Sequence, residues 1–163
     1  MAIVFNADEI LGMAEQIERN GAVFYRRAAS AHPGAAKLLL EIAHQEDRHR
    51  ETFEAMRRDL SDDLHQETAY DPDSEAGLYL KALADRRVFI LDSVPNGGLN
   101  GTESLEEIVA IAIGKEKDSI AFYAGLKSVV PVSLGADRLD AIIAEEVKHI
   151  AWLNRAFDET GAA

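Results

Sequence analysis

The sequence carries two short stretches of the same form, EDRH at residues 46–49 and EVKH at residues 146–149. Both follow the pattern Glu-x-x-His, which puts two side chains about one helical turn apart on the same face of a helix. Two further stretches also match each other, IERNGAVFY at residues 17–25 and GKEKDSIAFY at residues 114–123. In each of them a Glu stands six residues before a Phe-Tyr pair. The chain therefore contains the same charged and aromatic pattern twice, at nearly the same separation.

The composition of the chain, together with residues that start and end helices, predicts that these stretches lie in long helices. Ala, Leu, Ile, Glu and Arg are abundant and aromatic residues make up only 7% of the chain, which favours helix. Asn6 with Glu9, and Ser104 with Glu107, have the spacing of capping boxes that start helices, and Pro131 ends one. No stretch shows the sustained alternation of apolar and polar residues that is typical of a strand. Helices are predicted over about 7–31, 34–60, 74–92, 104–130 and 135–159.

The connections between the helices predict the topology. Tight turns, including one at Pro33, join the first two long helices and the last two, so each pair is expected to be antiparallel. A long polar segment, about 61–103, connects the pairs and contains the short helix, so the second pair does not simply continue an up-down bundle. The sequence therefore predicts an all-α four-helix bundle with a long crossover, in a single domain spanning 1–163.

Each long helix has one apolar face, and charged or imidazole side chains interrupt that face near its middle. Buried carboxylates cost several kcal/mol unless they are neutralised, and the apolar faces contain no Lys or Arg that could do so. Protonation and bound metal are the remaining forms of compensation. Two divalent cations would balance four carboxylates. The interrupting residues are Glu18, Glu46, His49, Glu116, Glu146 and His149.

Carboxylate and imidazole ligands together suit iron or manganese, and they are compatible with zinc. Spacing alone is a weak indication, because a third Glu-x-x-His match, Glu41 to His44, has neither end on an apolar face and is interpreted as surface. The metal interpretation depends on two such motifs and two lone Glu residues coinciding at the middle of four apolar faces. Glu145, next to a candidate ligand, is interpreted as lying on the surface or beside the site.

One Glu from each of two helices and Glu-x-x-His from each of the other two resemble the ligand set of ferritin-like diiron carboxylate proteins. Within that group the chain resembles the diiron domain of the rubrerythrin family, over nearly its whole length. The resemblance implies a ferritin-like bundle with two iron ions, bridged by Glu46 and Glu146, and a homodimer. By resemblance the metal ligands are Glu18, Glu46, His49, Glu116, Glu146 and His149.

Four further residues lie close to the candidate ligands in the sequence. Tyr25 and Tyr123 match tyrosines near the metal site of the family. They are interpreted as core aromatics whose hydroxyls hydrogen-bond a ligand carboxylate, with electron donation as the alternative. Gly21 and Ala112 are small residues on the apolar faces, and they either leave room for metal and oxidant or let the helices approach closely.

The chain departs from the rubrerythrin pattern in two ways. It contains no Cys, so the rubredoxin module that supplies electrons in rubrerythrins is absent from this sequence, and a separate rubredoxin-like donor is expected. Rubrerythrins also have a second Glu three residues after the lone Glu of the third long helix, where this chain has Ser119. That carboxylate is associated with iron movement and fast peroxide reduction. The site therefore also resembles the more symmetric ferroxidase centres of bacterioferritin type.

The resemblance implies a non-haem dinuclear iron protein that reacts with peroxide or oxygen, in a rubrerythrin-like response to oxidative stress with an external electron donor. Two alternatives remain open. One is a ferroxidase or iron-handling protein, and the other is a structural metal-binding bundle without turnover. The rate at which peroxide and oxygen reoxidise the reduced protein would distinguish the three.

The overall composition excludes several other classes of function. A net charge of −12 argues against nucleic acid and anionic membranes as partners, because both attract clustered Lys and Arg. The absence of Cys excludes disulfides, thiolate zinc sites and iron–sulfur clusters. No signal peptide and no apolar run of membrane-spanning length is apparent, so a cytoplasmic location is expected.

Overall fold

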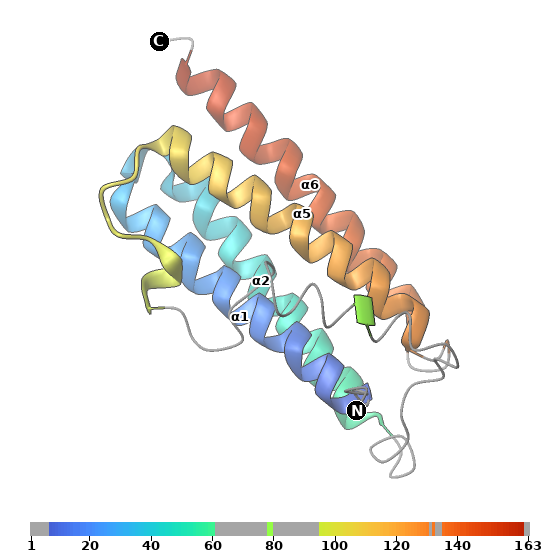
Figure 1. Ribbon diagram of the computed structural model, residues 1–163. Coiled ribbons are helices and arrows are strands. Elements are labelled where there is room, and N and C mark those ends of the chain that lie inside the picture. Colours follow the sequence, from blue (N-terminus) through green and yellow to red (C-terminus); the bar gives the residue numbers. More distant parts are fainter. Residues whose placement is uncertain (1–6, 61–77, 80–94, 131, 133–134, 162–163) are drawn as a thin grey trace.

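The computed structural model describes residues 7–60, 78–79, 95–130, 132 and 135–161. Within these ranges the protein is helical and contains no strand, which confirms the predicted all-α class. None of the helices described there has both the length and the hydrophobicity that crossing a lipid bilayer requires. The elements are α1 (Ala7–Ala31), η1 (Pro33–Ala35), α2 (Ala36–Arg58), η2 (Pro95–Gly98), α5 (Leu105–Val129) and α6 (Ala136–Gly161), as Figure 1 shows.

The helix bounds lie close to those predicted. α1 has the predicted bounds, and the Ser104–Glu107 capping box at the start of α5 is present in both directions. α2 begins two residues later than predicted, because Pro33–Ala35 forms a 3₁₀ turn before the α-helix starts at Ala36. The predicted helix over 74–92 lies outside the described residues except for residues 78–79, which are helical.

The four long helices form two antiparallel pairs, α1 with α2 and α5 with α6 (Figure 1). α2 and α5 run in the same direction, so the end of α2 and the start of α5 lie at opposite ends of the bundle. α1 also contacts α5, and α2 contacts α6, so the two pairs face each other. This is the up-down-down-up order expected from a long crossover.

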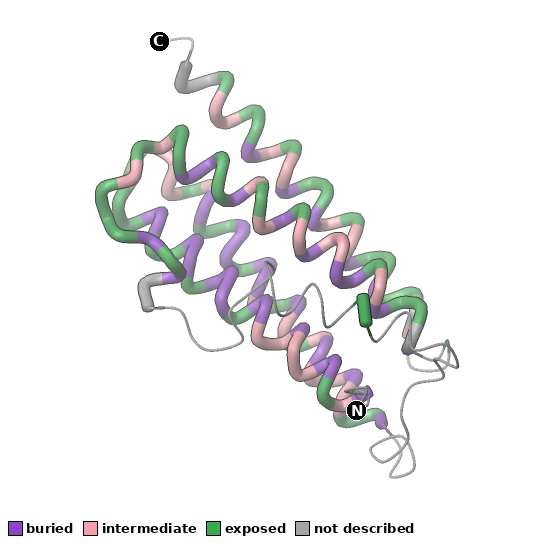
Figure 2. The backbone as a smooth tube through the Cα atoms, viewed as in Figure 1, coloured by how far each residue is buried: buried purple, intermediate pink, exposed green. Residues whose placement is uncertain are grey.

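The apolar core is divided into two clusters, one toward each end of the bundle. Leu11, Phe53 and Leu126 belong to one cluster, and Ile42 and Leu153 belong to the other. Buried residues lie on the sides of the helices that face other helices, and exposed residues lie on the outer sides (Figure 2). The charged positions of all four apolar faces therefore fall between two layers of hydrocarbon.

The segment that leads into α5 is fixed against α1 by a close backbone contact. Gly97 in η2 has a φ of +65°, and a Cβ there would lie 2.4 Å from the Cα of Phe24. Only glycine fits both the conformation and the space. Leu99, two residues later, is buried in the same apolar cluster as Phe24. This contact positions the start of α5 beside the half of α1 that carries Tyr25.

Candidate metal centre

The six residues predicted as ligands meet between the two apolar clusters. All are buried, and none exposes more than 5% of its surface. Their ligand atoms form two groups, each with all its atoms within 4.8 Å of one another. Glu46 and Glu146 belong to both groups, which is the arrangement that bridging carboxylates require. The groups are Glu18, Glu46, His49 and Glu146, and Glu46, Glu116, Glu146 and His149.

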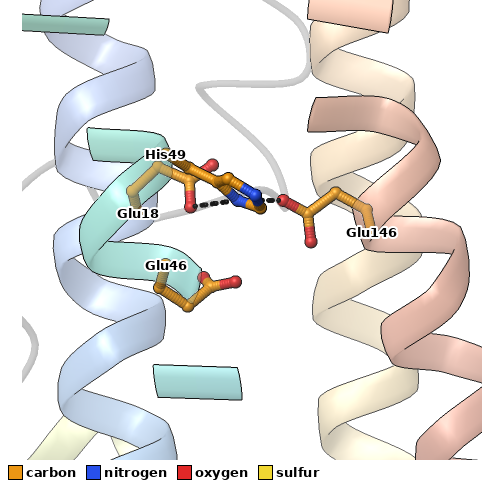
Figure 3. A group of neighbouring side chains, drawn as sticks. All are labelled: Glu18, Glu46, His49 and Glu146. Carbon is orange, nitrogen blue, oxygen red and sulfur yellow. Dashed lines mark ion pairs between the residues drawn. The ribbon is translucent and has the colours of Figure 1, made fainter. Parts of the chain in front are cut away.

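The helix pairs contribute to the two groups across the space between them. In Figure 3, Glu18, Glu46 and His49 extend from α1 and α2 toward Glu146 on α6. Because residues three apart lie on one helical face, Glu46 and His49 reach the same region from a single helix. Neither helix pair alone supplies a complete group, so the site depends on the packing of one pair against the other.

Several polar atoms inside these groups lack the hydrogen bonds that buried atoms normally make. Within the described part of the chain, the atoms Glu18 Oε2, Glu46 Oε1, His49 Nδ1 and Glu146 Oε1 have no hydrogen-bond partner. His49 Nδ1 lies 3.0 Å from Glu146 Oε1 and 3.4 Å from Glu18 Oε2, without hydrogen-bond geometry. Buried polar atoms are almost always paired. Oxygen and nitrogen atoms that converge in this way fit a cation as their common partner.

Both histidines point one ring nitrogen inward and the other outward. His149 Nδ1 lies 3.0 Å from Glu146 Oε2, and its Nε2 lies 3.1 Å from Gln45 Oε1. His49 Nε2 lies 2.6 Å from Glu145 Oε2. Glu145 therefore lies beside the site, as one of its two sequence interpretations held. Nothing in the sequence indicated Gln45, although its place directly before Glu46 matches that of Glu145 before Glu146.

The two tyrosines connect the helix pairs through hydrogen bonds to the lone Glu residues. Tyr25 on α1 donates its hydroxyl proton to Glu116 on α5, and Tyr123 on α5 donates to Glu18 on α1. Both rings are buried, and burial together with the nearby carboxylates raises the pKa of each hydroxyl well above 10. They therefore remain protonated donors, and the predicted hydrogen bonds of both tyrosines to carboxylates of the candidate site are present.

The carboxylates have strongly altered affinities for protons. Burial, reinforced by neighbouring carboxylates, raises the pKa of Glu18 and of Glu46. Burial and a hydrogen bond with Glu146 raise the pKa of Glu116 to about 8. Burial alone would raise the pKa of Glu146, but a hydrogen bond with Glu116 and the close imidazoles of His149 and His49 lower it. Without a cation, protons shared among these four groups limit their mutual repulsion.

The pKa values of both histidines are raised as well, although burial acts on them in the opposite direction. Burial alone would lower the pKa of His49, but the close carboxylates of Glu146 and Glu18 raise it to about 11. Burial also acts to lower the pKa of His149, and hydrogen bonds with Glu116 and Glu146 raise it to about 9. Protons thus occupy positions that metal ions would take, and metal binding at this site would displace them.

Gly21 makes room for the Glu46 carboxylate. A Cβ at Gly21 would lie 2.0 Å from Glu46 Oε2, so any larger residue would push that carboxylate aside. The space beside Gly21 is thus occupied by the Glu46 side chain from the neighbouring helix, and the sequence interpretations, room for metal and oxidant or close approach of the helices, stay open. Ala112 is fully buried in the apolar cluster around Tyr25, and Ser119 is buried on the same face of α5 as Glu116.

The third Glu-x-x-His match is on the surface, as its sequence position indicated. Glu41 and His44 are both exposed. Glu41 nevertheless accepts a hydrogen bond of 3.2 Å from the amide nitrogen of Gln45, and so helps to orient the amide that faces His149. Burial, rather than spacing, separates this match from the two motifs at the centre of the bundle.

Comparison with known proteins agrees with this geometry. The sequence model of the Rubrerythrin family matches residues 9–87, a region that includes Glu18, Glu46 and His49. In fold, the chain is similar to the crystal structure of a Thermotoga maritima protein described as a ferritin-like diiron-carboxylate protein. The two share 27% sequence identity with a TM-score of 0.68, over 96% of this chain and 97% of that one. No curated protein matches the chain significantly. The resemblance to a rubrerythrin-type, ferritin-like diiron domain is confirmed.

Proposed function

We propose that this rubrerythrin-type, ferritin-like domain holds two iron ions, one in each ligand group, and serves as a redox protein that reacts with peroxide or oxygen. The observation that carries the proposal is the pair of four-residue groups sharing Glu46 and Glu146, with buried ligand atoms that lack hydrogen bonds. Four carboxylates neutralise two divalent ions, and the mixed oxygen and nitrogen ligand set suits iron.

When bound, the two iron ions would supply the electrons that reduce peroxide or oxygen. The chain supplies position and environment. Tyr25 and Tyr123 hold the Glu116 and Glu18 carboxylates in place, and the outward partners of the histidines fix which ring nitrogen faces the metal. The apolar clusters on both sides keep bulk water away from the site. Turnover would use electrons from a separate rubredoxin-like protein, and a homodimer is the proposed assembly.

A ferroxidase role is the second candidate, and Ser119 is the observation that favours it. Ser119 is buried one turn after Glu116, where rubrerythrins place the additional Glu associated with fast peroxide reduction. Without that carboxylate the two ligand groups are matched in composition, each with three Glu and one His. In this case oxygen would be the preferred oxidant of the reduced protein, and oxidised iron would leave the site.

The first experiment measures metal content by plasma mass spectrometry, on protein produced in iron-replete medium. We expect about two iron ions per chain in the parent, as the charge balance requires, and almost none in the Glu46→Ala/Glu146→Ala variant. The His44→Ala variant is the control, because it breaks an exposed motif of the same spacing but keeps the Glu41 carboxylate that orients Gln45, and it should keep the iron. A parent protein that takes up no stoichiometric metal, even after anaerobic addition of Fe(II), would overturn the proposal.

Stopped-flow reoxidation of the reduced, iron-loaded protein then separates the candidate functions. Peroxide reacting much faster than oxygen would support a peroxidase, and the reverse order would support a ferroxidase or oxidase. A protein that holds two ions but reacts with neither oxidant within minutes would be a structural metal-binding bundle. Manganese or zinc at two ions per chain would retain the site and contradict the iron assignment.

A further inference from the structure

The two ligand groups are matched residue for residue, but the outward partners of their histidines are not. Each group contains one histidine, one lone Glu and the two shared Glu residues. His49 contacts the carboxylate of Glu145, whereas His149 contacts the amide of Gln45. Gln45 and Glu145 stand at equivalent places, each directly before the Glu of a Glu-x-x-His motif. The near symmetry of the site is therefore broken just outside the ligands.

The surroundings of each histidine show which atom donates and which atom accepts in these two contacts. Nδ1 of each histidine faces the ligand carboxylates, so in the metal-bound form Nε2 carries the proton and donates it outward. The amide nitrogen of Gln45 donates to Glu41 at 3.2 Å, which leaves the amide oxygen to accept from His149 at 3.1 Å. On the other side, Glu145 Oε2 accepts from His49 at 2.6 Å. The contact to the carboxylate is the shorter of the two.

A carboxylate and an amide affect the donating imidazole differently. A hydrogen bond to an ionised acceptor is roughly twice as strong as one between neutral groups. It also increases the basicity of the imidazole and fixes its orientation toward the metal. Glu145 is partly exposed, with 38% of its side-chain surface accessible, so its carboxylate keeps contact with solvent beside the buried site. Gln45 is buried and carries no charge.

We infer that the two metal positions are unequal, and that the position formed by Glu18, Glu46, His49 and Glu146 binds a divalent cation more tightly than the other. Glu145 is the positioning residue responsible, because it acts on the cation through His49. The inference rests on the proposed function, since it requires that both groups bind metal. It predicts that at one cation per chain, the cation occupies the position next to His49.

The test is a titration of the metal-free protein with Co(II), followed by visible absorption and calorimetry at constant pH and ionic strength. Two cations sharing ligands repel each other, so stepwise binding alone does not locate the first one. The first binding constant is therefore compared between His49→Ala and His149→Ala. We expect a loss of about 10- to 100-fold in His49→Ala, and little change in His149→Ala. Equal losses in the two variants would overturn the inference.

Two charge variants then assign the cause. Glu145→Gln should weaken the first step by about 10- to 100-fold with little change in the second, and Gln45→Glu should strengthen the second step. A residue with only a structural role would weaken both steps together. Glu51→Gln is the control, because it removes a negative charge from the exposed side of α2 and should leave both constants unchanged.

The possible results separate the inference from the proposed function. If Glu145→Gln leaves the first constant unchanged while the parent binds two Co(II), the inference is wrong and metal binding stands. If the parent binds no Co(II), the proposed function itself fails. Circular dichroism of each metal-free variant establishes that the helices are intact before the constants are compared.

Discussion

Gly21 leaves the space on α1 that the Glu46 carboxylate occupies. The Cβ of an alanine at this position would lie 2.0 Å from Glu46 Oε2. That distance is far below van der Waals contact, so the Glu46 carboxylate would have to shift from its present position. Because Glu46 is shared between the groups, the displacement would affect both metal positions.

Gly21→Ala is therefore expected to weaken Co(II) binding in both steps of a titration. Gly114→Ala is the matched control, because Gly114 is also a helical glycine but a Cβ there meets nothing within 4 Å. That control should bind metal normally and gain about 0.5–1 kcal/mol of stability from the better helix former. Unchanged Co(II) affinity in Gly21→Ala would show that Glu46 can coordinate from another conformation.

Replacing Tyr25 by Phe tests the hydrogen bonds that connect the helix pairs. Tyr25→Phe removes the donor to Glu116 and leaves a buried carboxyl oxygen unpaired, at an expected cost of about 1–3 kcal/mol. Urea denaturation of the metal-free protein would measure this loss. Tyr79→Phe is the control, since the Tyr79 hydroxyl donates to Ala121 at an exposed position where water can replace it. Equal losses in the two variants would contradict a special role for the buried contact.

The candidate ligands could be predicted from the sequence because a charge on an apolar face has a large energetic consequence. Glu116 and His149 stand out for this reason, and the structure brings them together with the other four. Gln45 could not be predicted in the same way, because an uncharged amide at the edge of an apolar face is unremarkable. Its importance depends on the distance to a histidine on the opposite helix pair, which no local pattern contains.

Among the helices, α5 offers the clearest test of a local stabilising feature. Ser104 Oγ accepts from the Glu107 N–H at 3.1 Å, and Glu107 Oε2 accepts from the Ser104 N–H at 2.7 Å. Ser104→Ala removes one of these bonds and should lower the free energy of unfolding by about 1 kcal/mol. Ser128→Ala, in the last turn of the same helix, serves as control. An equal effect of both substitutions in thermal melts would argue against the cap.

The helices were predictable and their junctions were less so. The apolar periodicity and the caps gave the bounds of α1 and the start of α5. The 3₁₀ turn at Pro33–Ala35 was not predicted, because Pro at a helix start is compatible with either geometry. The close contact of Gly97 with Phe24 could not be predicted either, since the two residues are far apart in the sequence. The predicted helix over 74–92 remains a prediction.

Across the bundle, the shifted proton affinities predict how stability depends on pH. In the folded, metal-free protein the pKa of Glu116 is raised from 4.5 to about 8 and that of His149 from 6.5 to about 9. Glu116 therefore binds more protons in the folded state than in the unfolded state between about pH 4.5 and pH 8, and His149 does so between about pH 6.5 and pH 9. The stability of the metal-free protein falls as the pH rises through these two ranges. The lowered pKa of Glu146 acts in the opposite sense, but only below about pH 4.5.

Thermal melts of the metal-free protein in chelator should thus give a lower Tm at about pH 9 than at about pH 6. Added Co(II) should raise the Tm more at the higher pH, because bound protons no longer compete with the metal. Glu116→Gln cannot titrate at this position and should show a smaller pH dependence. A metal-free protein that becomes more stable between these pH values would contradict the proton assignments.

The unlike pair of Gln45 and Glu145 has a consequence for how such a bundle can be built. α1 with α2, and α5 with α6, are two hairpins of similar design that face each other. Had the bundle been assembled from two identical hairpins about a twofold axis, the same residue would necessarily stand beside both histidines. Covalent continuity removes that constraint. One chain can differentiate two chemically distinct positions inside an almost symmetrical scaffold, a freedom that a homodimer of hairpins does not have.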